Sequence, residues 1–293
     1  INGNVGNAGY MMSYRYLNQQ GLTVGNTTGE KRHNFRIKLN TKMLSRINLS
    51  TNIGYMNSNV LSPVNSLSNG DGAIYNAMRI APNAPIYYTD GTWAYGGGNT
   101  NPVAVLCDGG SINTGSEQVS IHNVVKFDLL KGWDATATYN ITSNNAFRNT
   151  LKKTITFANP DDKSTFNYSS PNTLKNRDIR GVQQTLIFQT NFDFKFNSHS
   201  ISGVAGFSQE WSESAWFEAG RNKLITEKDP TLNLGDPSTM SNDSGARSWA
   251  IRSGFGRVTY NYEGRYLAEV NLKWGRGSRL HKSNRGGVFP SFS

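Results

Sequence analysis

Four histidines, one cysteine and several neighbouring carboxylates are the residues of this sequence that could do acid–base, nucleophilic or metal chemistry. The histidines lack the His-x-x-x-His spacing of a zinc site, and they are His33, His122, His199 and His281. Cys107 has no second cysteine with which to share a metal or a disulfide. The pairs Asp161–Asp162 and Glu227/Asp229 lie where we expect loops, which favours solvated turns over glycosidase chemistry. We therefore predict that the protein is not an enzyme and has no cofactor or metal site.

An aromatic cluster beside an Asp-Gly turn offers binding chemistry instead. Aromatic faces supply apolar area for a sugar ring or a peptide, and Asp and Asn side chains beside them supply hydrogen bonds. We predict a substrate-binding surface composed of Tyr87, Tyr88, Asp90, Trp93, Tyr95, Asn99 and Asn101. The sequence leaves open the alternative that these aromatics only fold their own loop or contact a partner protein.

The overall composition narrows the class of protein. The chain has a formal net charge of +10, but no run of five Lys or Arg residues occurs, which argues against nucleic acid as a partner. The mean hydropathy is −0.54 and no stretch of about 18 apolar residues is present, which excludes a transmembrane helix. Membrane-spanning β-strands remain possible, because their signal is a weak alternation and not an apolar run.

Alternation of apolar and polar residues recurs along the chain and predicts an all-β fold. Near residue 190, for example, Phe188, Phe192 and Phe194 alternate with Gln189 and Asn191. The pattern predicts about ten strands, at 9–18, 31–43, 46–57, 119–130, 133–148, 178–196, 199–212, 246–262, 265–275 and 286–293. Most of these exceed the five or six residues typical of globular strands and match a tilted membrane crossing.

The connections between the predicted strands alternate between long and short. They are residues 19–30, 44–45, 58–118, 131–132, 149–177, 197–198, 213–245, 263–264 and 276–285. Outer-membrane barrels sort their connections in this way, with short periplasmic turns and long extracellular loops. Residues 58–118 are too long for a structureless connection, so we expect a functional or internally folded extracellular loop with a short helix near residues 72–80. We thus predict an antiparallel transmembrane β-barrel segment.

Several motifs resemble one family in order along nearly the whole chain. They include Asp90-Gly91, the segment from Gly96 to Ala104, the turn Leu130-Lys131-Gly132-Trp133 and His199-Ser200-Ile201-Ser202-Gly203. Near the C-terminus they are Phe255-Gly256-Arg257-Val258, Tyr260, Tyr262, Tyr266-Leu267, Gly277-Ser278-Arg279, Asn284-Arg285 and Phe289-Pro290-Ser291. Together they resemble the SusC/RagA-like TonB-dependent transporters. One departure lies after the strand that ends near Trp274, where residues 275–280 replace a loop start that begins with an acidic residue in that family.

The resemblance implies a 22-stranded outer-membrane barrel with a plug domain inside it, of which residues 1–293 would be a central fragment of about ten strands. It implies uptake of oligosaccharides, or of peptides, with energy from the TonB–ExbB–ExbD complex and with a SusD-like surface lipoprotein as partner. Outer-membrane lipid and lipopolysaccharide would surround the barrel. The sequence leaves two rival hypotheses, a secreted soluble β protein that binds carbohydrate and a passive porin.

Overall fold

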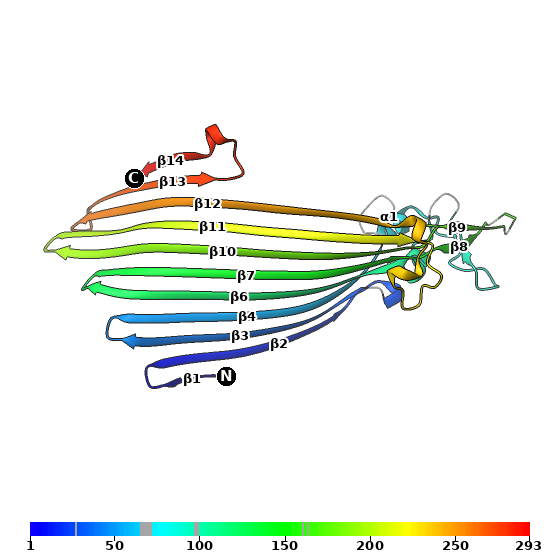
Figure 1. Cartoon of the computed structure of the whole chain (residues 1–293), viewed down its shortest axis with the longest axis horizontal. Coiled ribbons are helices and arrows are strands. Elements are labelled where there is room, and N and C mark those ends of the chain that lie inside the picture. The colour runs from blue at the N-terminus through cyan, green and yellow to red at the C-terminus, as the bar shows by residue number, and fades with distance from the viewer. Residues whose placement is uncertain (27, 65–71, 97–99, 160, 163) are drawn as a thin grey trace.

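The computed structural model describes residues 1–26, 28–64, 72–96, 100–159, 161–162 and 164–293. Most of them form one large antiparallel sheet, in which each strand pairs with its neighbours along the chain (Figure 1). In spatial order its eleven strands are β1 (Asn2–Val5), β2 (Ala8–Gln20), β3 (Gly29–Leu44), β4 (Ile47–Pro63), β6 (Gly110–Leu130), β7 (Trp133–Lys152), β10 (Thr173–Phe196), β11 (His199–Asn222), β12 (Ser241–Tyr262), β13 (Tyr266–Gly277) and β14 (Gly286–Phe292).

All ten predicted strands are present, and the predicted all-β antiparallel fold is confirmed. The structure adds β1, a four-residue edge strand that is too short to show alternation. The strands also extend further than predicted on the side of the long connections. For example, β6 begins at Gly110 and β4 ends at Pro63, so residues 64–109, and not 58–118, connect the two strands. The added segment of β6 contains Asn113, Thr114 and Ser116, so backbone pairing continues there without apolar alternation.

The short turns lie at one end of the sheet and the long connections at the other, as predicted (Figure 1). The turn between β6 and β7 depends on Gly132, whose φ is +79°. A Cβ atom at this position would lie 2.3 Å from the carbonyl oxygen of Asp193 in β10. Only glycine therefore fits here without a shift of the backbone.

The two faces of the sheet differ in polarity. Residues directly opposite one another in antiparallel strands point to the same face, and one row across the sheet consists of Leu49, Val125, Ala137, Phe188, Phe207, Gly254, Trp274 and Val288. An adjacent row on the other face includes Lys42, Asn48, Lys126, Thr136 and Gln189. Phe188 is 50% exposed, and no second layer covers the apolar face within the described residues. A soluble sandwich would bury that face, so the structure does not favour the soluble hypothesis.

The buried core lies among the long connections. A small sheet forms there from β5 (Trp93–Ala94), β8 (Ile155–Ala158) and β9 (Thr165–Tyr168). Helices α1 (Ala73–Arg79) and α2 (Pro102–Asp108) accompany it, with short 3-10 turns at η1 (Val24–Asn26), η2 (Leu232–Leu234), η3 (Pro237–Thr239) and η4 (Lys282–Asn284). The predicted helix near residues 72–80 is confirmed as α1. No helix in the described part of the chain has the length and apolar character that a membrane span requires.

Candidate functional site

The long connection between β4 and β6 folds around a small hydrophobic core. Val105 of α2 and Ile155 and Phe157 of β8 are almost fully buried, and Trp93 and Tyr95 pack against them. Residues 93–94 pair with β8, which belongs to the next long connection. Two connections thus form one folded unit at this end of the sheet, which explains how so long a segment is ordered.

Tyr87 and Trp93 form a stacked aromatic pair at the surface of this unit. Their rings stack with centroids 4.3 Å apart, on either side of a tight turn. In the turn, Asp90 Oδ1 accepts hydrogen bonds from the backbone N–H of Thr92 at 3.0 Å and from its hydroxyl at 2.6 Å. Gly91 provides the positive φ of +82°. Tyr87 remains 50% exposed, so its ring is available for contact with a ligand.

The indole of Trp93 is held in place by α2. Its Nε1–H donates a hydrogen bond of 2.7 Å to Oδ2 of Asp108, the last residue of that helix. Beside Trp93 is an open pocket of about 400 Å³, whose charged lining residues are Asp108, Lys153 and Glu227. Pockets that bind small ligands start at about 300 Å³ and combine aromatic surface with a few polar groups. The pocket can therefore hold one sugar ring or one or two amino-acid residues.

Two of the other predicted site residues, Asn101 and Tyr95, make contacts that hold the loop together. Asn101 is 1% exposed and caps α2, since its Oδ1 accepts from the backbone N–H groups of Val103 and Ala104. Its amide nitrogen donates to the carbonyl oxygens of Ile86 and Ala94, so all its hydrogen-bonding capacity is used inside the loop. Tyr95 packs edge-on against Phe166 at 5.0 Å.

The remaining predicted site residues are Tyr88 and Asn99. Tyr88 lies in the Tyr87–Trp93 turn and is half-buried, and Asn99 lies outside the described residues. The structure thus brings together Tyr87, Asp90 and Trp93 at the surface and assigns Tyr95 and Asn101 to the fold of the loop. For Asn101 the sequence contains a signal of this structural role, which is an N-cap residue followed by proline in the first turn of a helix. Contact with substrate stays a prediction for the whole set.

The residues considered above for acid–base and metal chemistry have ordinary structural contacts in the described part of the chain. Each histidine contacts a neighbouring polar side chain: His33 pairs with Tyr14, His122 with Asn140, His199 with Tyr260 and His281 with Ser283. Over the described ranges, no three His, Cys, Asp or Glu residues gather into a metal site. Burial raises the pKa of the Cys107 thiol, and the neighbouring Asp108 raises it further, so the thiolate is disfavoured.

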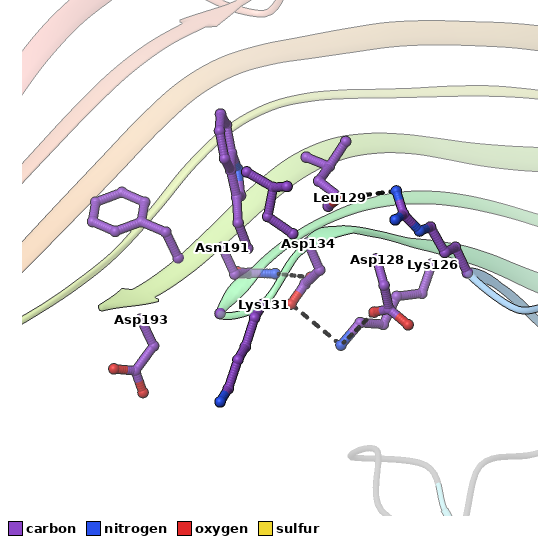
Figure 2. Close-up of a pocket in the computed structure, with 12 residues that line it drawn as sticks. Lys126, Asp128, Leu129, Lys131, Asp134, Asn191 and Asp193 are labelled. Carbon is purple, nitrogen blue, oxygen red and sulfur yellow. Dashed lines mark hydrogen bonds and ion pairs between the residues drawn. The ribbon is translucent and has the colours of Figure 1, made fainter. Parts of the chain in front are cut away.

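A second cleft, which the sequence did not reveal, lies at the opposite end of the sheet beside the β6–β7 turn. It has a volume of about 650 Å³, and Figure 2 shows its charged side chains. Lys126 Nζ lies 3.2 Å from Asp134 Oδ2 and 3.8 Å from Asp128 Oδ1, and Asn191 donates to Asp134 at 2.9 Å. These residues lie on the polar face of the sheet, so alternation indicated their orientation but not their convergence.

Comparisons with known proteins identify the fold. No family model matches the chain. Two curated proteins of Formosa agariphila are similar, TonB-dependent receptor P3 (25% identical over 76% of this chain) and TonB-dependent receptor P39 (25% identical over 48%). Among solved structures, the RagAB peptide transporter superposes on 99% of this chain with a TM-score of 0.78 at 14% identity. The chain has the barrel fold of a SusC/RagA-like TonB-dependent transporter.

This barrel segment is shorter than the proteins that it resembles. It spans 22% of receptor P3, 15% of receptor P39 and 32% of the RagAB chain. The RagAB importer in its open-open state gives a TM-score of 0.79, whereas the ferric preacinetobactin receptor BauA from Acinetobacter baumannii gives 0.51. The barrel segment is thus closer in shape to RagAB than to this siderophore receptor, and the family resemblance of the sequence is confirmed.

Proposed function

We propose that residues 1–293 form part of the barrel of an outer-membrane importer that takes up oligosaccharides or peptides with TonB-derived energy. The observation that carries this proposal is the large single-layer sheet, whose apolar face is uncovered and whose long connections all lie at one end. An uncovered apolar face of this size needs lipid or another layer to shield it from water. The similar curated proteins are named TonB-dependent receptors, which favours active import over a passive porin.

The long connections are proposed to face the outside of the cell and to meet the substrate. Tyr87 and Trp93 would stack on a sugar ring or a peptide side chain, while Asp108, Lys153 and Glu227 would pair with its polar groups. A SusD-like lipoprotein is the partner that we propose for this end. It would cover the folded unit of loops and enclose the substrate.

The charged cleft at the other end is proposed to contact the plug domain. Its Lys126–Asp134 pair lies on the polar face, which becomes the inside of a closed barrel. Half-exposed ion pairs of this kind are weak by themselves. They can therefore exchange partners when TonB moves the plug, without a large loss of free energy.

The proposal is tested with the full-length protein in its own outer membrane. We expect it to fractionate with the outer membrane and to mediate uptake of fluorescent oligosaccharides or peptides that stops when TonB is deleted. Tyr87→Ala should weaken substrate binding by about threefold to tenfold, since an aromatic contact contributes about 0.5–1.5 kcal/mol. Tyr75→Ala is the matched control, because Tyr75 is an exposed aromatic of α1 that packs on Arg79. Uptake that continues without TonB would refute active import.

A further inference from the structure

Two arginines with the same charge face each other on the apolar side of the sheet. Arg252 of β12 and Arg276 of β13 are directly opposite in the register, so they point to the same face. Side chains in such positions have Cβ atoms about 5 Å apart, and like charges at that distance destabilise a sheet. Such a pair needs a compensating negative charge.

The described residues of this chain do not supply that charge. Both arginines are exposed, and neither takes part in an ion pair between described residues. Glu269 is the last acidic residue of the sequence, and its carboxylate accepts hydrogen bonds from Thr259 and Asn271 on the other face. From Val270 to Ser293 the chain has five basic residues and no acidic one, the five being Lys273, Arg276, Arg279, Lys282 and Arg285.

The position of the two arginines relative to the apolar surface indicates the source of the compensating negative charge. Between the β12–β13 turn and the two arginines, this face consists of Tyr262, Tyr260, Val258, Gly256 and Gly254 on β12 and of Tyr266, Ala268, Val270, Leu272 and Trp274 on β13. The arginines are the first charged residues above this surface. Tyr266, Val270, Leu272 and Trp274 are all more than 40% exposed.

The height of this apolar surface matches that of a membrane. Ten residues separate Tyr262 from Arg252 along β12, which at a strand tilt of about 45° corresponds to roughly 24 Å. The apolar band of outer-membrane barrels is about 25 Å tall and ends in aromatic residues. Tyr262 and Tyr266 would lie at one edge of the band, and Trp274 with the two arginines at the other, on the side of the long connections.

We propose that Arg252 and Arg276 bind the phosphate group of an anionic lipid headgroup in the outer leaflet. The proposal rests on the membrane placement proposed above and adds a specific lipid site to it. Two guanidinium groups side by side offer parallel N–H donors that match the oxygens of a phosphate. Trp274, two residues from Arg276 on the same face, would pack against the acyl chain below the headgroup.

The test measures lipid binding to the full-length protein in detergent by native mass spectrometry. The probes are diphosphorylated lipid A, the same lipid without phosphate, and inorganic phosphate. We expect the wild type to retain only the phosphorylated lipid, and Arg252→Gln/Arg276→Gln to bind it about 30-fold more weakly, since each basic residue near an anionic surface contributes about a factor of five. Arg265→Gln, which removes an exposed arginine of the β12–β13 turn, should bind as the wild type does.

Thermal stability without lipid provides a second measurement. Removal of one like charge should raise the melting temperature of the lipid-free protein, so Arg252→Gln should be more stable than the wild type until phosphorylated lipid is added. Equal lipid binding by wild type and double variant would overturn the proposal, and so would an equal loss in Arg265→Gln. Equal affinity for inorganic phosphate would show a site for free phosphate and not for lipid. A protein absent from the outer-membrane fraction would overturn the proposed function. Lipid binding in detergent is measured independently of membrane location, so failure of the lipid site and failure of the proposed function can be told apart.

Discussion

Replacement of Phe188 by lysine tests which face of the sheet meets lipid. Phe188 lies within the apolar row, next to Ala137 of β7 and Phe207 of β11, and half of its side chain is exposed. A lysine on the lipid face costs about 2–4 kcal/mol at the bilayer midplane and less toward the interfaces, so this range is the upper limit for Phe188. This corresponds to a decrease of about 30- to 1,000-fold in the ratio of folded to unfolded protein. The matched control is Gln189→Lys, one residue further along β10 on the polar face, where we expect a change near zero.

The assay is reversible denaturant unfolding of the full-length protein in lipid vesicles, in which both variants are compared with the wild type. Phe188→Lys should shift the midpoint strongly and Gln189→Lys should not. Equal shifts would refute the assignment of the two faces. A larger shift for Gln189→Lys would reverse that assignment and place the row of Phe188 inside the barrel.

Three further predictions concern the turns and loops. Asn101→Ala should destabilise the unit of loops locally, because it removes the four hydrogen bonds made by the buried Asn101 side chain, and hydrogen exchange of residues 72–96 and 100–108 should rise while that of β6 is unchanged. Gly132→Ala should lower the yield of folded protein in the outer membrane, since its Cβ would collide with the Asp193 carbonyl, whereas Gly6→Ala, at a positive φ but in open space, should have a smaller effect. Hydrogen bonds from Ser238 lower the pKa of Asp236 below its ordinary value of 3.8, so their contribution is present above that pH and is lost as the pH falls through the lower folded value. The protection factors of residues 223–240, which correct for the intrinsic pH dependence of amide exchange, should therefore be similar at pH 7 and pH 5 and should fall in acid, and this fall should be absent in Asp236→Asn.

The sequence predicted the sheet because its alternation has a single physical cause. Each strand has one face toward apolar surroundings and one toward polar surroundings, and this requires a period of two, as in β10 with Phe188 and Gln189. Where both faces of a strand are polar, as at the start of β6 around Asn113, the constraint disappears while the backbone pairing continues. The ends of the strands near the long connections were therefore predicted too short.

The sequence did not separate the surface residues of the predicted site from those that form the core of the loop, because residue type alone does not distinguish the two. Tyr87 and Tyr95 look equivalent in the sequence, yet one ring is half exposed and the other packs against Phe166. The difference depends on β8 and β9, which come from a connection some 60 residues later in the chain. The pocket beside Trp93 also includes Lys153 and Glu227, two residues with no local signal that links them to the aromatic cluster.

The two ends of the sheet differ in how their side chains are held in place. At the long-connection end the loops bury a core of their own, with Phe157 fully buried, so this end can hold rigid aromatic groups in water. At the turn end the described residues form a charged cleft with half-exposed ion pairs, which suits contacts that must break and reform. A transporter needs the first property where substrate is captured and the second where a plug must move. This difference between the two ends favours the proposed import from the long-connection end, where the aromatic pair lies, toward the turn end with its charged cleft.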